Sequence, residues 1–198
     1  MRSTQEEKTG TVSTQGTWDF SDDVVYKGQA IQGINESVVR EISRANEEPA
    51  WMLELRLKAL KLYEERAMPT WGPDLSKLDL NSIYYFRRPE GAGNNKSWDD
   101  VPENIKNTFD KLGIPEAEKK ALAGVGAQYD SETVYHSLKE EIAAQGVIFD
   151  DLSHALKEPK TEAIIKKYFS KSIPLTDHKF ASLHYAVWSG GTFLYVPK

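Results

Sequence analysis

The sequence predicts an α+β protein in which helices dominate the first half, and three observations support this class. Apolar residues recur at helical spacing between residues 35 and 63. Short β-favouring runs, separated by glycines, follow residue 126. The last residues include Phe193–Val196, an apolar run that comes directly after the turn signal Gly190-Gly191. With 198 residues, the chain is long enough for one domain or one and a half.

Three regions are expected along the chain. Residues 1–21 are rich in Thr, Ser, Gln and Glu, which predicts a flexible polar tail. Residues 22–125 predict a mainly helical amino-terminal domain with a few short strands. Residues 126–198 predict an α+β segment that ends in the final apolar strand.

The first two helices have clear start signals. Asn35 is a suitable N-cap for a helix whose Val38, Val39 and Ile42 share one face. Pro49 suits the first turn of the next helix, and Pro69 is expected to follow its end.

This second helix has a wider apolar surface than one contact face requires. Its first apolar stripe consists of Met52, Leu55, Ala59 and Leu62, and its second consists of Leu53, Leu57 and Leu60. Either the helix is buried among its neighbours, or one stripe binds a protein partner. For the second explanation, the candidate contacts are Trp51, Leu53, Leu57 and Leu60.

The middle of the chain predicts short, separate elements. We expect a strand at residues 83–86 and a surface loop at residues 90–97. Two helices are expected to follow, at residues 99–113 and 115–124. Asp99 and Asp100 are expected to cap the first of these two helices.

From residue 128 the pattern predicts a strand at residues 128–135, a helix at residues 137–146 and a second strand at residues 147–149. This order is compact but compatible with a crossover unit. Ser137 and Glu140 form a candidate capping box for this helix. Asp150 and Asp151 lie at the start of the next helix, and Thr161 is a candidate cap for the helix after that. One more helix is expected at residues 180–188.

The final strand needs partners that the sequence does not identify. A strand as apolar as Phe193–Val196 needs neighbours on its faces and its edges. It could pair with earlier elements, or it could begin a larger β structure that continues beyond residue 198. The second explanation is the one we expect.

Composition excludes several classes of function. The net charge of -5, from 25 basic and 30 acidic residues, argues against a general nucleic-acid or membrane-binding surface. No apolar stretch approaches the roughly 20 residues of a membrane span, and residues 1–20 lack the apolar stretch of a secretory signal. We therefore expect a cytoplasmic protein. The absence of cysteine removes thiolate nucleophiles and cysteine-ligated iron–sulfur clusters, so no cofactor is expected in this chain.

Two pairs of polar residues could carry chemistry. Asp130 and Glu132 lie two apart on a predicted strand and would share a face, as a carboxylate-dependent hydrolase requires. His178 and His184 could form a weak metal pair, although a hydrogen-bonded core histidine is the commoner explanation for His184. No motif specifies an enzyme, and we expect none.

Three stretches in the chain resemble the SufB/SufD family of iron–sulfur cluster assembly proteins, and its SufB members more than its SufD members. The first is GINESVVREIS at residues 33–43 with EPAWMLELRL at 48–57. The second is QYDSE at 128–132 with VYH at 134–136 and QGVIF at 145–149. The third is FASL at 180–183 with AVWSGGTFLYVPK at 186–198. Their order and spacing match the amino-terminal part of SufB-like proteins.

The resemblance implies a fold, a function and partners. Family members have an amino-terminal helical domain, a right-handed parallel β-helix core and a carboxy-terminal helical segment. The resemblance therefore implies that Phe193–Val196 is the first strand of the β-helix, of which this chain would hold only the start. It also implies a scaffold for iron–sulfur cluster assembly in the SUF system, with SufD-like subunits and SufC-like ABC-type ATPase subunits as partners.

The implied role for this chain is a structural and protein-interaction part of that scaffold, without cluster ligands of its own. The family's cluster-binding and sulfur-accepting residues lie in the core beyond residue 198, so none corresponds to a position here. Two alternatives remain open: a free-standing protein-binding adaptor derived from the family, and the carboxylate-dependent hydrolase.

The chain also departs from the family pattern. It has DHKFASLH at residues 177–184 where DNKFAALN is usual, and YFSK at 168–171 where YFGT is usual. Because glycine adopts the left-handed cap conformation most easily, Ser170 predicts an altered helix exit.

Overall fold

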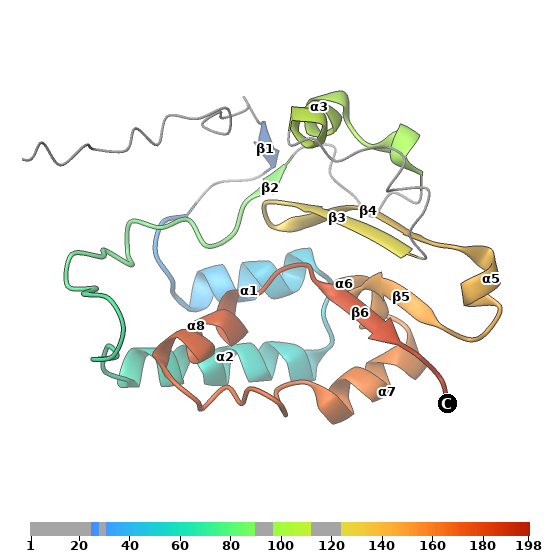
Figure 1. Ribbon diagram of the computed structural model, residues 1–198. Helices are drawn as coiled ribbons and strands as arrows, with labels where there is room; N and C mark the ends of the chain where they lie inside the picture. The colour runs from blue at the N-terminus through green and yellow to red at the C-terminus, as the bar shows by residue number, and fades with distance from the viewer. Residues whose placement is uncertain (1–24, 28–30, 90–96, 112–123) are drawn as a thin grey trace, which may run out of the picture.

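The helices and strands divide between a helical side and a side built from short antiparallel strand pairs. The computed structural model describes residues 25–27, 31–89, 97–111 and 124–198, apart from the side chain of Glu132. The helical side consists of α1 (Glu36–Ala45), α2 (Ala50–Glu65) and α8 (Lys179–Val187), shown in Figure 1. The predicted α+β class is confirmed. None of the helices in these ranges is both long and apolar enough to cross a membrane.

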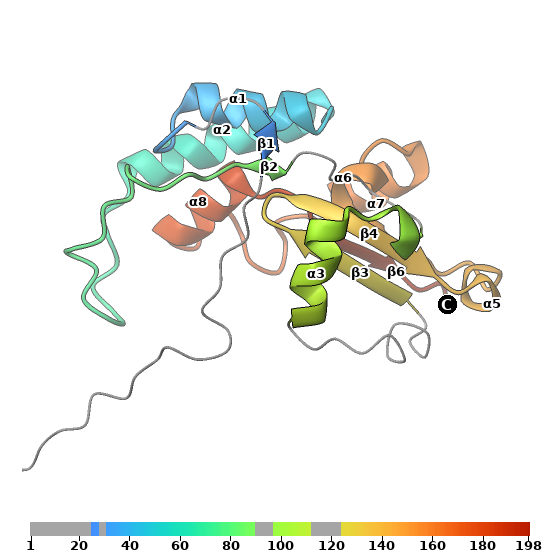
Figure 2. The same ribbon diagram turned by 90° about the horizontal axis from the view of Figure 1, so that it is seen from above.

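The second side is a stack of strands and short helices (Figures 1 and 2). Its strands are β3 (Gly124–Tyr129), β4 (Glu132–Leu138), β5 (Ile148–Asp151) and β6 (Thr192–Tyr195). Its helices are the 3₁₀ turn η1 (Trp98–Asp100), α3 (Glu103–Lys111), α5 (Glu140–Ala143), α6 (Leu152–Ala155) and α7 (Pro159–Tyr168). Between the two sides lies the short pair β1 (Tyr26–Lys27) and β2 (Arg88–Pro89).

Local signals explain how the first two helices begin. The side chain of Asn35 accepts a hydrogen bond from the Val38 amide at 3.0 Å, which confirms it as the N-cap of α1. Pro49 directly precedes α2, whose last residue is Glu65. Val38, Val39 and Ile42 are all buried, as their spacing predicts.

The core of the helical side joins residues that are far apart in the sequence. α8 packs along α2, and Val39 of α1 lies in the same core cluster. The other buried members are Ala59, Leu60, Tyr63, Tyr185 and Ala186. α2 and α8 thus share one core across residues 125–126, where the sequence analysis places a domain boundary; the boundary itself stays a prediction.

A buried ion pair fastens α2 to the end of α8. The Arg56 guanidinium donates two hydrogen bonds to the Glu48 carboxylate, at 2.7 and 2.5 Å, and both side chains are fully buried. It also donates to the carbonyl oxygens of Ala186 and Trp188, at 3.1 and 2.9 Å. Its central carbon lies 4.4 Å from the centre of the Trp188 ring. This hydrogen-bonded cluster satisfies a charge that would otherwise be costly to bury.

All strand pairs among the described residues are antiparallel, and this corrects two expectations. β3 and β4 form a hairpin with Asp130 and Ser131 at its turn, so residues 128–135 are not one strand. β5 pairs with β6, not in a parallel crossover unit with the strand before it. Asp130 has a φ of 49°, a left-handed conformation that aspartate tolerates better than most residues.

The final strand is paired on one edge within the chain, and its place at the start of a larger β structure stays a prediction. In β6, Phe193 lies opposite Asp150 and Tyr195 lies opposite Ile148. Leu194 and Val196 remain 59% and 63% exposed. β6 therefore has a partner on one edge and apolar side chains at the surface.

Several predicted caps and boundaries are wrong. The expected strand at 83–86 contains only an isolated bridge at Tyr84, and the strand β2 comes after it. Asp99 and Asp100 lie in η1, which Ser97 caps, and α3 begins only at Glu103. Asp151 is confirmed as the N-cap of α6, with its carboxylate 3.1 Å from the His154 amide.

Two other expected caps serve different roles. Ser137 lies within β4, and α5 begins at Glu140 without a side-chain cap. Thr161 is buried inside α7 and donates to the Ala155 carbonyl oxygen. The predicted tail, most of the loop at 90–97 and the helix at 115–124 lie outside the described residues, apart from Gly124, which begins β3.

Ser170 keeps the left-handed helix exit although it is not glycine. α7 ends at Tyr168, and Ser170 has a φ of 62°. Its hydroxyl oxygen accepts a hydrogen bond from the Leu175 amide at 3.1 Å. The expected change in the helix exit is therefore not seen, because serine adopts the conformation that glycine would take.

The β3–β4 hairpin lies between α3 and the β5–β6 pair (Figure 2). On the α3 side, Ile105 and Val134 are completely buried in one cluster with Val101. Toward β5, the His136 ring lies 4.3 Å from the Phe149 ring, measured between centres. His136 is 8% exposed, and its Nε2 atom has no hydrogen-bond partner among the described residues.

This burial predicts that the fold is less stable in acid. Burial lowers the pKa of His136, and the nearby charges of Asp150 and Asp151 only partly oppose this. The unfolded chain then binds the proton more readily, starting near the ordinary histidine pKa of about 6.5. Above that pH, the neutral His136 side chain does not reduce the free energy of unfolding. As the pH falls from about 6.5 through the lowered pKa, the unfolded chain binds the proton first, and the free energy of unfolding decreases.

Urea unfolding at about pH 7.5 and about pH 5.5 tests this expectation. Because other carboxylates also titrate, the informative quantity is the difference between the chain and its His136→Gln variant. The variant should lose less free energy of unfolding between the two pH values. His184→Gln, at an exposed histidine, should behave like the unchanged chain. Equal pH dependence in all three proteins would contradict the prediction.

Candidate functional site

The second apolar stripe of α2 lies largely against the core. Leu60 is 5% exposed and belongs to the main cluster of the helical side. Leu53 and Leu57 are half-buried and pack against the same cluster. Trp51 is half-buried at the start of α2 and donates from Nε1 to the Glu162 carboxylate at 2.8 Å. A partner-binding role for these four residues stays a prediction, with Trp51, Leu53 and Leu57 as its accessible members.

The structure separates the predicted carboxylate pair. Asp130 lies in the hairpin turn, and Glu132 begins β4, so they do not share a strand face. The Asp130 carboxylate accepts a hydrogen bond from the Tyr26 hydroxyl at 2.7 Å. Burial raises the pKa of Tyr26, and this hydrogen bond is the next largest cause; together with the remaining charges they bring the pKa to about 12. Asp130 therefore holds the hairpin turn against β1, which is a structural role.

The two candidate metal-binding histidines have separate roles. His178 is the N-cap of α8: its Nδ1 atom accepts from the Ala181 amide at 3.3 Å. His184 is exposed and contacts Tyr185 edge to face, so it is not the core histidine that we expected. Within the part of the chain that the structure describes, no group of three or more His, Cys, Asp or Glu residues could hold a metal ion.

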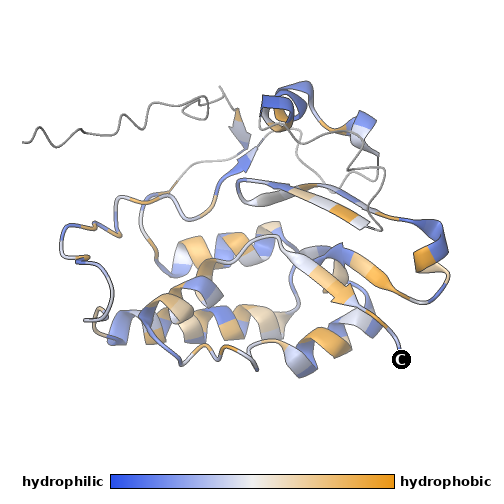
Figure 3. Ribbon diagram, viewed as in Figure 1, coloured by the Kyte–Doolittle hydropathy of each residue, from blue (hydrophilic) through white to orange (hydrophobic). Residues whose placement is uncertain are grey.

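An apolar groove lies between α7 and β6, and the sequence analysis did not identify it. Its volume is about 700 Å³. Lys167 is the charged residue in its lining; the others are Leu152, Ala163, Ile164, Ile165, Tyr168, Phe169, Phe193, Leu194 and Tyr195. Figure 3 shows hydrophobic residues along both β6 and α7. We call this surface the α7–β6 groove.

Two large side chains of this groove face solvent. Tyr168 is 61% exposed and Leu194 is 59% exposed. Scattered exposed apolar residues are normal, but a contiguous apolar groove is typical of a binding surface. Ile165 and Phe193, which also line the groove, pack into the core behind it.

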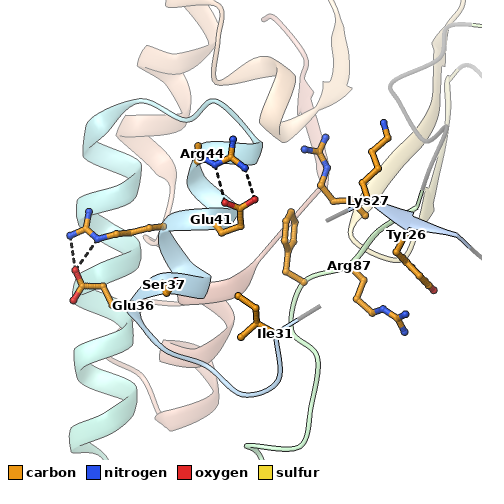
Figure 4. Close-up of a pocket in the computed structure, with 11 residues that line it drawn as sticks. Tyr26, Lys27, Ile31, Glu36, Ser37, Glu41, Arg44 and Arg87 are labelled. Atoms are coloured by element: carbon orange, nitrogen blue, oxygen red, sulfur yellow. Dashed lines mark hydrogen bonds and ion pairs between the residues drawn. The ribbon is translucent and has the colours of Figure 1, made fainter. Parts of the chain in front are cut away.

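A second opening, with different chemistry, lies between α1 and the β1–β2 pair (Figure 4). Its volume is about 620 Å³. Its charged lining consists of Lys27, Arg40, Arg44, Arg87 and Arg88 together with Glu36 and Glu41. Tyr26, Ile31, Ser37 and Phe86 complete it. We call this surface the basic cleft.

The glutamates of the basic cleft are neutralised by arginines of their own helix. Arg40 donates two hydrogen bonds to Glu36, at 2.8 and 2.6 Å, and Arg44 donates two to Glu41, at 2.9 and 2.6 Å. The hydrogen bond from Arg44 is the main cause that lowers the pKa of Glu41, and the charge of Arg88 adds to it. The remaining lining is therefore positively charged, on a chain whose net charge is -5.

Comparison with known proteins identifies the family. No protein-family model matches the chain. Over 181 residues, or 91% of its length, the chain is 52% identical to an iron-sulfur cluster assembly SufBD family protein of Staphylococcus haemolyticus (strain JCSC1435). The same values hold for SufBD family proteins of Staphylococcus aureus strains USA300 and NCTC 8325. The chain spans 38% of the length of these relatives. The resemblance is thereby confirmed: over 91% of its length, this chain is similar to the amino-acid sequences of SufBD family iron–sulfur cluster assembly proteins.

Proposed function

We propose that this chain is a structural and protein-interaction part of a SufB-like iron–sulfur cluster assembly scaffold. Two observations support a role without chemistry of its own. The chain contains no cysteine, so it has no thiolate to hold a cluster. Among its candidate carboxylates and histidines, Asp130 supports a turn and His178 caps a helix, so both have structural roles.

The observation that carries the interaction role is the α7–β6 groove. An apolar cavity of this size, open to solvent and bordered by Tyr168 and Leu194, offers an apolar surface and a hydroxyl-bearing ring to a partner. The burial of such a surface on binding would supply much of the affinity. The helical core behind it holds the groove in place, because Ile165 and Phe193 pack in one cluster with Met52 of α2.

The partners proposed from the family resemblance are SufD-like subunits and SufC-like ABC-type ATPase subunits. The same resemblance makes β6 the first strand of a right-handed parallel β-helix in the longer relatives. A free-standing adaptor derived from the family is the second candidate, because β6 is already paired with β5 inside this chain. In both cases the chain binds proteins, works in the cytoplasm and is not an enzyme.

A binding experiment with two aspartate variants tests the proposal. Leu194→Asp and Tyr168→Asp place a charge in the groove and should weaken binding to a purified SufD-like or SufC-like subunit at least tenfold. Surface plasmon resonance with the immobilised chain measures the dissociation constant, and thermal unfolding confirms that each variant is folded.

The matched control is Ile173→Asp. Ile173 is 60% exposed but does not line the groove. This control should bind like the unchanged chain. The proposal fails if neither subunit binds the chain, or if the control variant loses as much affinity as the groove variants.

A further inference from the structure

We propose that the basic cleft between α1 and β1–β2 binds an acidic peptide segment of a partner protein, in which apolar side chains alternate with carboxylates. The inference extends the proposed protein-interaction function to a second surface with different chemistry. It depends on the residues of the cleft and not on the α7–β6 groove, so the two proposals can fail separately.

The first argument is the balance of charge. Five basic residues line the cleft against two glutamates, and both glutamates already form ion pairs with Arg40 and Arg44. Lys27 is exposed and forms no ion pair with any described residue. Because the chain as a whole is negative, this local excess of positive charge would steer a negatively charged segment to the cleft.

The second argument is that the wall of the cleft already binds carboxylates. Arg44 donates one hydrogen bond to each oxygen of Glu41, the geometry in which arginine recognises carboxylate groups. Arg40 donates two hydrogen bonds to one oxygen of Glu36. In Figure 4, Lys27 extends from β1 along the side of the cleft opposite Arg44. A peptide between them would meet basic groups on both walls.

The third argument is the apolar floor. Ile31, which is 39% exposed, and the half-buried Phe86 lie between the charged walls. A small inorganic anion would leave these side chains uncovered, whereas a peptide with alternating apolar residues would bury them. Arg87 plays a different part: its guanidinium lies 3.7 Å from the centre of the Tyr26 ring and points away from α1. It contributes charge near the cleft and holds β1 in position.

The test uses the full chain and a short, end-blocked peptide of alternating glutamate and leucine as the probe. Isothermal titration calorimetry should show binding that weakens as salt is added. Lys27→Glu should weaken binding about tenfold, since it replaces an attraction with a repulsion at an exposed position. Ile31→Ala should weaken it about threefold by removing part of the apolar floor.

Three controls make the result decisive. Lys61→Glu makes the same change of charge on α2, outside the cleft, and should leave the affinity unchanged. A peptide with glutamine in place of glutamate should not bind. Pyrophosphate should neither bind tightly nor displace the peptide, because tight binding would identify the cleft as a phosphate site.

The proposal is overturned if the acidic peptide does not bind, if pyrophosphate displaces it, or if Lys61→Glu weakens binding as much as Lys27→Glu. Leu194→Asp in the α7–β6 groove should leave peptide binding intact. If the peptide binds but neither subunit binds the chain, the proposed function fails and this inference stands. If a subunit binds the chain but the peptide does not, this inference fails and the proposed function stands.

Discussion

Replacing Arg56 with methionine is expected to lower the free energy of unfolding by about 3–5 kcal/mol. The substitution removes the partner of the Glu48 carboxylate, whose side chain is fully buried. It also removes the hydrogen bonds to the carbonyl oxygens of Ala186 and Trp188 and the contact with the Trp188 ring. Methionine fills a similar volume, so the loss reports the unpaired charge and the lost hydrogen bonds and not a cavity.

Urea unfolding monitored by circular dichroism and by tryptophan fluorescence measures this loss. The double variant Arg56→Met, Glu48→Gln removes both charges and should recover part of the stability, because no charge is left buried without a partner. Arg40→Met is the matched control: Arg40 also pairs with a glutamate, but its side chain is 53% exposed. If Arg40→Met lowers the free energy of unfolding as much as Arg56→Met does, this explanation is contradicted.

Replacing Leu60 with aspartate is expected to cost about 3–5 kcal/mol or more, a large part of the total stability of a domain. Leu60 is 5% exposed and packs in the core between α2 and α8, where a carboxylate would have no partner among the described residues. Leu57→Asp should cost clearly less, because Leu57 is half-buried. Lys58→Asp, at an exposed position on the same helix, should change stability by only about 0.5 kcal/mol.

Chemical unfolding of the three variants separates the two explanations for the second stripe of α2. If Leu57→Asp remains folded and loses affinity for a SufC-like or SufD-like subunit, the stripe contributes to binding. If it unfolds together with Leu60→Asp, the stripe is core, and the predicted partner contacts at Leu53 and Leu57 are wrong.

Local chemistry made some elements predictable from the sequence. Asn35 and Asp151 were identified as N-caps because a helix start depends on a few neighbouring residues. The final apolar strand was located from its residues and from the turn before it, but its partner was not. β5 and β6 are separated by α6, α7 and α8, and strand pairing over that distance leaves no local pattern.

Two other errors have identifiable causes. The turn at Asp130 lacks glycine and proline, so residues 128–135 resembled one alternating strand. Arg56 follows Met52 by four residues, which places it on a buried face of α2. The sequence analysis did not include Arg56 in the buried face, because a charged side chain is usually exposed. Sequence analysis missed both candidate binding surfaces, because each is formed by elements that are distant in the chain.

The bond from Arg56 to the end of α8 has a consequence for the order of events during protein synthesis. Arg56 and its acceptor Trp188 are 132 residues apart. While the ribosome makes the chain, α1 and α2 leave the exit tunnel long before α8 has been synthesised. Until α8 emerges, the apolar side of α2 has no cover from that helix, and chaperones or neighbouring nascent chains could bind it. The helical side can therefore complete its folding only when nearly the whole described chain has left the ribosome.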